Sequence, residues 1–312
     1  MMRDTGHDTG WGENRLFYGY RLRSDIALPS LPLLADAGAP ELTLRRGPVP
    51  DCLPEPSWSS PFVELGANGT LLVRIGDTLK FIIRDGRDIV LDQHSRAETS
   101  VIETFLFSVV AGSILHQRGM LALHASCVMI GDRAIALAGV SGRGKSTLAG
   151  ALSMQGHAVV TDDICPITFR ENTALVIPGP ARVRLWPDAA QMLGLGQDQL
   201  AIGRPQHPKR ILAVAGPDAT PKPLAALIRI AIDKQLNEPV LYRLNGAAAI
   251  TPIEEIVYRA RLGRRLGRRI GLFTDLVRLA GLVPVFQLVR PEGDGDLPRL
   301  TDLVRSVIAR PG

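Results

Sequence analysis

A glycine-rich loop between two apolar segments constrains the fold of this chain more than any other feature. The loop matches the pattern GxxxxGK[ST] at every fixed position, with the residues Gly139-Val140-Ser141-Gly142-Arg143-Gly144-Lys145-Ser146. The apolar run 133–138 precedes the loop, and a helix-forming stretch, 147–155, follows it and ends before Gly156. This context predicts a strand, a loop and a helix in succession. The alternative is a glycine-rich turn that binds nothing.

The chemistry of such a loop follows from its composition. Glycines let successive backbone N–H groups point inward, and the N-terminus of the helix that begins near Thr147 adds partial positive charge. Lys145 reaches the outer phosphates of a nucleotide, and Ser146 offers a hydroxyl to Mg²⁺. Residues 139–147 therefore predict a phosphate site, of the kind called a P-loop, within an α/β domain.

Two adjacent aspartates, Asp162 and Asp163, follow the next apolar run, 158–161. A right-handed crossover makes this run parallel to the strand 133–138, so both strands end at the same edge of the sheet. The two carboxylates are therefore expected to face the loop. Adjacent carboxylates can divide the work, one holding Mg²⁺ and the other accepting the proton of an attacking hydroxyl. An ordinary turn or helix cap is the alternative.

A predicted hairpin places His124 beside the same loop. The runs 121–130 and 133–138 are joined by Gly131-Asp132, and a two-residue turn pairs Ile130 with Arg133. The same register sets His124 opposite Gly139, the first residue of the loop. A histidine satisfied within the core is the alternative.

The remainder of the chain divides into a β-rich part and a mixed part. Short β-forming runs fill residues 16–92, at 17–22, 42–44, 62–65, 71–75, 79–83 and 89–91. A long helix is predicted over 98–117. The C-terminal third alternates strands at 225–232, 240–244 and 283–289 with helices at 253–262, 272–279 and 300–308. The fold class is therefore α/β, with a mixed sheet that follows a β-rich N-terminal module.

The positive charge of the chain is local. With 36 Lys and Arg against 31 Asp and Glu, the net charge is +5, and the six arginines between residues 259 and 269 account for it. Such a patch suits an acidic peptide or RNA, but its glycines and leucines, without aromatics, favour a solvated helix face or a contact in a homo-oligomer. We therefore expect no nucleic-acid partner.

Cysteine usage and hydropathy indicate a cytoplasmic protein. Three scattered cysteines (Cys52, Cys127 and Cys165) form no CxxC motif, which argues against a disulfide framework or a zinc site. The apolar stretch 101–115 is too short to span a membrane and contains Glu103, so a buried helix is predicted there. The first fourteen residues contain no apolar signal region.

The spacing of these motifs resembles one kinase family. Lys145 comes 21 residues after His124, and the Asp pair comes 17 and 18 residues after Lys145. This arrangement is similar to the catalytic domain of HPr kinase/phosphorylase, whose fold is like the core of phosphoenolpyruvate carboxykinase. The resemblance implies phosphorylation of a serine hydroxyl with ATP and Mg²⁺. It assigns the catalytic base to Asp162, a supporting role to His124 and metal contact to Ser146 and Asp163, beside the catalytic Lys145. On this basis, residues 1–96 form the N-terminal module and 97–312 the catalytic domain.

Departures from the family narrow the acceptor. Ala125 and Thr147 stand where the HPr enzymes usually have Gly and Glu, and their Gly/Arg-rich signature loop is missing, so HPr is not the expected substrate. The layout is closer to the HPr-kinase-like serine kinases of ribosomal-peptide pathways. That likeness implies an unstructured peptide or small protein as acceptor, with the C-terminal serine of a lasso-peptide precursor as the favoured case. A regulatory NTPase or nucleotide-gated binding module, and a small-molecule kinase, remain alternatives.

Several further residues are candidates for contacts to the substrates. Arg184, with Arg182 and Trp186, suits a nucleobase or a phosphate, although a solvated strand end is equally compatible. Lys209 and Arg210 lie in a proline-rich stretch and would bring positive charge to the transferring phosphoryl group, against the favoured alternative of a solvated loop. The N-terminal module either recognises the acceptor or only covers the catalytic core.

Overall fold

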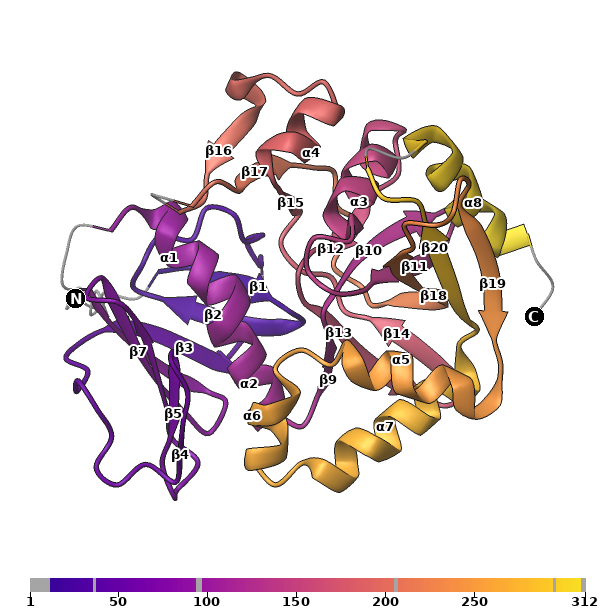
Figure 1. Cartoon of the computed structure of the whole chain (residues 1–312). Helices are drawn as coiled ribbons and strands as arrows, with labels where there is room; N and C mark the ends of the chain where they lie inside the picture. Colours follow the sequence, from indigo (N-terminus) through magenta and orange to yellow (C-terminus); the bar gives the residue numbers. More distant parts are fainter. Residues whose placement is uncertain (1–11, 36–37, 94–96, 205–206, 294–295, 310–312) are drawn as a thin grey trace, which may run out of the picture.

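Two large β-sheets lie side by side and form the framework of the molecule (Figure 1). The computed structural model describes residues 12–35, 38–93, 97–204, 207–293 and 296–309. One sheet has eight strands and the other has nine, of which some pairs are parallel and some antiparallel. The predicted α/β class with a mixed sheet is confirmed.

The eight-stranded sheet is built from the N-terminal residues in the order β1-β2-β3-β8-β7-β6-β5-β4. Its strands are β1 (Asn14–Phe17), β2 (Tyr20–Ser24), β3 (Leu42–Arg46), β4 (Trp58–Ser59), β5 (Val63–Leu65), β6 (Leu71–Ile75), β7 (Leu79–Arg84) and β8 (Asp88–Gln93). The single strand predicted over 17–22 is wrong. Phe17 pairs with Tyr20, so Tyr18 and Gly19 form a two-residue hairpin turn between β1 and β2. Their φ angles of 47° and 82° are the positive values that a type I′ turn requires at both positions.

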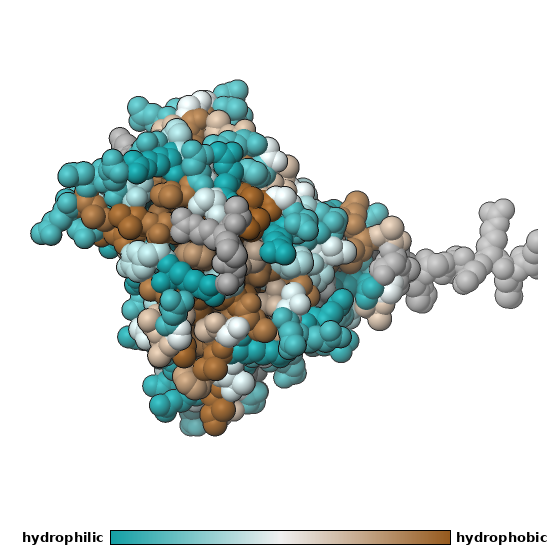
Figure 2. All heavy atoms as spheres, turned by 90° about the vertical axis from the view of Figure 1, so that its right-hand side faces the viewer, coloured by the Kyte–Doolittle hydropathy of each residue, from teal (hydrophilic) through white to brown (hydrophobic). Residues whose placement is uncertain are grey.

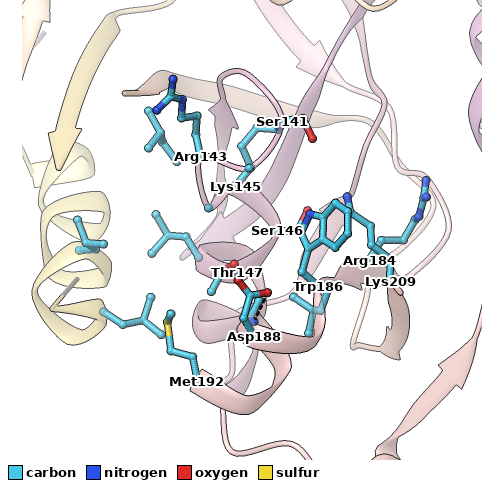
Figure 3. Close-up of a pocket in the computed structure, with 18 of the residues that line it drawn as sticks. Ser141, Arg143, Lys145, Ser146, Thr147, Arg184, Trp186, Asp188, Met192 and Lys209 are labelled. Carbon is cyan, nitrogen blue, oxygen red and sulfur yellow. Dashed lines mark hydrogen bonds between the residues drawn. The ribbon is translucent and has the colours of Figure 1, made fainter. Parts of the chain in front are cut away.

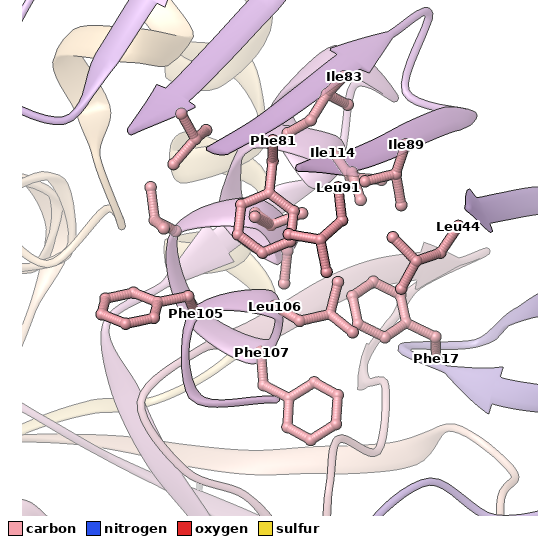
Figure 4. Packing of buried hydrophobic residues seen from close by; sticks show 14 of the residues in the cluster. Phe17, Leu44, Phe81, Ile83, Ile89, Leu91, Phe105, Leu106, Phe107 and Ile114 are labelled. Carbon is pink, nitrogen blue, oxygen red and sulfur yellow. The ribbon is translucent and has the colours of Figure 1, made fainter. Parts of the chain in front are cut away.

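A long helix completes the core of this sheet. Its segments are α1 (Thr99–Phe105), the π-helical turn η1 (Leu106–Val110) and α2 (Ala111–Gln117). Figure 4 shows Phe105, Leu106 and Ile114 packed against side chains of the sheet such as Phe17 and Phe81. The domain boundary predicted at residue 96 falls among residues 94–96, which lie outside the described ranges. It would separate this sheet from the helix that fills the core of the sheet.

The same helix is longer than the predicted apolar stretch. Thr99–Gln117 has 19 residues, long and apolar enough to cross a membrane by length and composition, but 83% of its most apolar window is buried inside the protein. The expectation that this segment is too short to cross a membrane is therefore wrong. The expectation of a buried helix holds, because most of the apolar window is packed inside the protein. Figure 2 shows another face of the molecule, on which hydrophobic and hydrophilic residues interleave.

The nine-stranded sheet carries the glycine-rich loop. Its strands are β9 (Leu121–Leu123), β10 (Ala125–Ile130), β11 (Arg133–Ala138), β12 (Val159–Thr161), β13 (Cys165–Arg170), β14 (Thr173–Val176), β18 (Lys222–Ile232), β19 (Val240–Leu244) and β20 (Val285–Arg290). The predicted hairpin register is confirmed, because Ile130 pairs with Arg133 and Ala125 with Ala138. The strand β12 runs parallel to β11 as expected, but β10 lies between them.

Helices cover both faces of this sheet. Ile135 and Leu137 of β11 pack with α3 (Lys145–Met154) and α8 (Leu297–Ala309), whereas Ala134 and Ala136 pack with α5 (Ile250–Glu255) and α7 (Arg269–Leu282) on the other face. A third sheet of β15 (Arg182–Leu185), β17 (Arg210–Ala213) and β16 (Leu200–Ile202) lies beside α4 (Pro187–Met192) (Figure 1). The short 3₁₀ turns η2 (Gln197–Gln199) and η3 (Gly246–Ala249) complete the secondary structure.

Two predicted elements are broken at the same place. The run 121–130 splits into β9 and β10 at His124, and the helix predicted over 253–262 splits into α5 and α6 (Ala260–Arg265). The connector between α5 and α6 pairs with the split strand: the N–H of Tyr258 donates to Ala122 O at 2.8 Å, and that of His124 donates to Ile256 O at 2.6 Å. Backbone pairing between distant segments therefore overrides the local helical pattern.

Candidate active site

The glycine-rich loop connects β11 to α3, and its glycines adopt conformations that other residues avoid. Gly139, Gly142 and Gly144 have φ angles of 142°, 82° and 96°. A Cβ on Gly139 would lie 2.7 Å from the carbonyl oxygen of Ile230 in the neighbouring strand β18. The loop therefore needs glycine at Gly139 both for its backbone angle and for the close approach of β18.

Lys145 begins α3 and is held inside the loop. Its side chain is nearly buried, and Nζ donates to the carbonyl oxygens of Gly139 at 2.8 Å and Val140 at 3.4 Å. Burial lowers the pKa of Lys145, although the carboxylates of Asp162 and Asp163 act in the opposite direction. An ammonium group at the centre of a loop of backbone amides can bind phosphate oxygens.

Asp162 accepts three hydrogen bonds. Its Oδ1 accepts from the hydroxyls of Ser126 at 2.6 Å and Ser146 at 3.0 Å, and its Oδ2 accepts from the backbone N–H of Arg184 at 2.9 Å. A hydroxyl and a carboxylate that converge beside a phosphate loop are oxygen ligands of the type that Mg²⁺ prefers. The donor set of Ser146 and Asp162 therefore fits Mg²⁺ bound together with a nucleotide.

This pair differs from a metal site made of protein ligands alone. Across the described part of the chain, no group of three or more His, Cys, Asp and Glu side chains is arranged to hold a metal ion. Magnesium in nucleotide sites keeps several waters and takes other ligands from phosphates, so two protein oxygens suffice.

Asp163 has different surroundings. It adopts a left-handed conformation, with φ of 73°. Its Oδ2 lies 3.2 Å from Nη1 of Arg184, and its Oδ1 lies 3.5 Å from Nδ1 of His124. Burial raises the pKa of Asp163, but the neighbouring positive charges, that of Arg184 above all, outweigh it and hold the pKa below its ordinary value. Asp163 is therefore a carboxylate at neutral pH.

His124 lies at the break between β9 and β10. Its Nδ1 is 2.9 Å from the backbone oxygen of Asp163, and burial lowers its pKa below the ordinary value. A neutral imidazole that donates from Nδ1 to this carbonyl keeps Nε2 as an acceptor. His124 thus orients the Asp163 backbone and offers a second acceptor in the same place.

A cavity of about 790 Å³ joins these groups. It is lined by the loop from Ser141, by Lys145, Ser146 and Thr147 of α3, and by His124, Asp163, Arg184, Trp186 and Lys209. Figure 3 shows Lys145 and Arg143 on one side of this space and Trp186, Arg184 and Lys209 on the other. The volume lies in the range of cavities that hold small-molecule ligands. Asp162 does not line it and lies behind it.

The remaining candidates separate into two groups. Lys209 lines the cavity, with Nζ 5.2 Å from the centre of the Trp186 ring, and burial lowers the pKa of Lys209. Arg210 does not line it, because its Nη1 donates to the carbonyls of His207 and Pro208 and the residue borders a separate groove beside α4. Arg182 is buried, with its guanidinium 4.5 Å from the ring of Phe107.

No sequence pattern indicates Tyr18, which lies behind the Asp pair. The side chain belongs to the β1–β2 turn, is almost fully buried, and donates its hydroxyl to the carbonyl of Phe107 at 3.1 Å. Tyr18 borders a small cavity together with Asp162, Asp163 and Arg182. Burial raises the pKa of Tyr18 far above its ordinary value, so the phenol stays protonated. The N-terminal sheet therefore contacts the site from behind.

Comparisons with known proteins add little to this geometry. No protein-family model matches the chain, and no curated protein matches it. One similar solved structure is the Hpr(Ser) kinase/phosphatase from Coxiella burnetii, which is 15% identical, has a TM-score of 0.31, and covers 60% of this chain and 93% of its own. A TM-score below 0.5 does not establish a shared fold, so the site's geometry has to carry any functional conclusion.

Proposed function

We propose that this protein is a kinase that transfers the γ-phosphoryl group of ATP, with Mg²⁺, to a hydroxyl group on a peptide or small protein. The observation that supports this most is the position of Asp163 and His124 in the same cavity as Lys145 and Ser146. A site that only binds a nucleotide does not need an acidic and an imidazole acceptor opposite the phosphate loop, whereas a kinase needs one to activate its acceptor. An NTPase would use the same group on water, so the products distinguish these two activities.

The residues suit the steps of phosphoryl transfer. The amides of residues 139–146 and the ammonium of Lys145 would bind the phosphates, and Ser146 with Asp162 would hold Mg²⁺, which neutralises developing charge when bound. Asp163 accepts the proton of the acceptor hydroxyl as that oxygen forms its bond to phosphorus. The bond from phosphorus to the β-phosphate oxygen breaks, and ADP leaves. Arg184 and Lys209 would stabilise the charge on the transferred group.

This mechanism exchanges the two aspartates relative to the assignment from the family resemblance. There Asp162 is the base and Asp163 binds the metal. Here the carboxylate of Asp162 accepts a hydrogen bond from the Ser146 hydroxyl and does not line the main cavity, whereas Asp163 lines that cavity beside His124. These contacts favour Asp163 as the base and Asp162 as the metal ligand. The acceptor class, including the C-terminal serine of a lasso-peptide precursor, and a cytoplasmic location rest on the sequence alone.

Product analysis tests the proposal. The full chain is incubated with radiolabelled ATP, Mg²⁺ and either a synthetic peptide ending in serine, its alanine-ended counterpart, or free serine. A kinase of this class labels the serine peptide and not the alanine peptide, and Asp163→Asn strongly slows the labelling while the exposed turn variant Asp132→Asn preserves it. Release of free phosphate with every acceptor identifies an NTPase instead, and labelling of free serine alone identifies a small-molecule kinase.

A further inference from the structure

The helices α6 and α7 form a cleft that the proposed phosphoryl transfer does not use. The cleft has a volume of about 700 Å³ and is bordered by residues of α5, α6 and α7 together with Val257. Because α5 and α7 cover the face of the nine-stranded sheet opposite α3, the cleft is remote from the phosphate loop (Figure 1). Any role for the cleft is therefore separate from the chemistry of the candidate site.

The floor and one wall of this cleft are apolar. Val257, Leu272 and Leu276 are buried side chains that border it. Beside them, Ile270 and Phe273 are 81% and 59% exposed, and Val277 continues the same helical stripe at 42%. Large apolar side chains seldom gather on one exposed helix face unless another surface covers them.

The rim of the cleft is strongly basic. Arg264, Arg265 and Arg269 border it, and Glu254 is the acidic residue on its lining. Arg264 pairs with that glutamate at 3.3 Å. Within the part of the chain that the structure describes, Arg265 and Arg269 have no ion pair or side-chain hydrogen bond, and neither does the nearby Arg261. Guanidinium groups without an acidic partner around an apolar floor would complement a ligand that has both acidic and apolar side chains.

Other occupants fit this surface less well. A second copy of the chain, docked through the same patch by two-fold symmetry, would bring the two sets of arginines together. RNA would leave the apolar floor uncovered by apolar groups. Phe273 is the single aromatic side chain on the lining, which provides little surface for base stacking. A membrane surface is flat on this scale, whereas the lining is concave.

We infer that the α6–α7 cleft docks an acidic amphipathic peptide segment of a partner protein. Apolar side chains of the segment, spaced three or four residues apart, would occupy the floor beside Phe273 and Ile270. Asp or Glu side chains on its flanks would pair with Arg265 and Arg269. This combines two of the recurring modes of peptide recognition, an apolar helix face in a groove and acidic groups on arginines.

Fluorescence anisotropy with the full chain tests this inference. The probe is a labelled helical peptide with leucine along one face and glutamate along the other, and its control is a scrambled peptide of the same composition. We expect the ordered peptide to bind more tightly than the scrambled one, with an affinity that falls as salt is added. The double variant Arg265→Glu/Arg269→Glu should weaken binding at least about tenfold, because it replaces two attractions with repulsions.

Matched variants separate the cleft from general charge and hydrophobicity. Phe273→Ser should also weaken binding, and Ile270→Ser replaces it if the first variant melts early. Arg133→Glu and Val240→Ser, at exposed sites elsewhere, should bind as the wild type does. Equal binding of the scrambled peptide, wild-type affinity in the cleft variants, or tighter binding of polyuridylate or phosphatidylserine vesicles would each overturn the inference. Self-association that the cleft variants abolish would assign the surface to a second copy and overturn it too.

Discussion

Asp162 and Asp163 are adjacent in sequence but differ in what surrounds their carboxylates. Asp162 accepts hydrogen bonds from two serine hydroxyls and a backbone N–H, and Asp163 borders the cavity between Arg184 and His124. We expect Asp163→Asn to slow phosphoryl transfer by about 10²–10⁴-fold while nucleotide affinity is preserved, because an amide cannot accept the proton. Single-turnover transfer and nucleotide titration, measured together, check this.

Asp162→Asn should give the complementary result. We expect weaker nucleotide binding in the presence of Mg²⁺ and little change in its absence, since an amide is a poorer ligand for Mg²⁺ than a carboxylate. Titrations over a range of Mg²⁺ concentrations measure the effect. If Asp162→Asn instead removes the chemical step and spares metal-dependent binding, the roles inferred from the family resemblance are right and ours are exchanged.

Lys145 concentrates the positive charge of the loop at one buried atom. We expect Lys145→Ala to reduce transfer at least about 10²-fold, because the charge that stabilises the phosphoryl group is lost. The melting temperature should change little, since the ammonium contacts only loop carbonyls and its burial is itself unfavourable. Lys234→Ala, at an exposed ion pair, is the control. Wild-type turnover in Lys145→Ala would contradict the assignment of the loop.

The sequence predicted the position of a site residue only where that residue lies at a fixed spacing from the glycine-rich loop. His124 follows from a two-residue turn and a register, and both are observed. The sequence did not indicate that Tyr18 and Ser126 lie beside the Asp pair, or that Arg210 lies outside the cavity. These positions depend on contacts between segments distant along the chain. No local pattern encodes such contacts, because a tyrosine in a β-forming run reads the same whether it faces solvent or an aspartate.

At the scale of elements, β11, the loop and α3 act as one unit whose geometry depends on β18. We expect Gly139→Ala to abolish nucleotide binding and to destabilise the fold by about 1–3 kcal/mol, because the new Cβ would collide with the Ile230 carbonyl at a backbone angle that alanine avoids. The matched control is Gly131→Ala in the β10–β11 turn, which has φ of 63° and open space around it. It should cost about 1 kcal/mol and leave nucleotide binding unchanged. Calorimetric titration and melting of both variants check this.

The contact between α2 and the α5–α6 connector should make stability depend on pH. His116 is fully buried in α2, with Nε2 2.7 Å from the Tyr258 oxygen, and burial lowers its pKa below the ordinary 6.5. In the unfolded chain this histidine is protonated below about pH 6.5, whereas in the folded chain it stays neutral to a lower pH. The free energy of unfolding therefore decreases as the pH falls below 6.5. We expect His116→Gln to reduce this loss between pH 6.5 and 5. Parallel denaturation profiles for variant and wild type would show that another group is responsible.

Elements with strong local signals were predicted well, and those set by pairing were not. The strands 71–75 and 240–244 were predicted with their observed bounds. The helix predicted over 253–262 failed because Val257 bridges to Leu123, and Arg259 adopts a positive φ of 48°. Periodicity indicates what a segment prefers in isolation, and a free strand edge nearby can outweigh that preference.

At the scale of the whole molecule, the two sheets are joined through the helix 99–117 and the turn at Tyr18. We expect deletion of residues 1–92 to yield an aggregating or loosely packed chain, because side chains such as Ile102, Leu106 and Ile114 would lose the sheet they pack on. Each buried aliphatic side chain of this size contributes about 1.5–3 kcal/mol. Size-exclusion chromatography and near-UV circular dichroism measure the outcome. A monomeric truncation with a native spectrum would mean that the sheet only covers the catalytic part.

The turn at Tyr18 also has a consequence for the order of events on the ribosome. The eight-stranded sheet and its covering helix are encoded entirely before β9, whereas β18, the strand that β11 and β20 both join, comes more than a hundred residues after that helix. Domains fold as units from the N-terminus during synthesis. The N-terminal sheet can therefore be complete, with Tyr18 already in place, when Asp162 and Asp163 leave the exit tunnel. The rear wall of the candidate site would then be a surface that exists before the site does, against which the nascent catalytic strands are assembled.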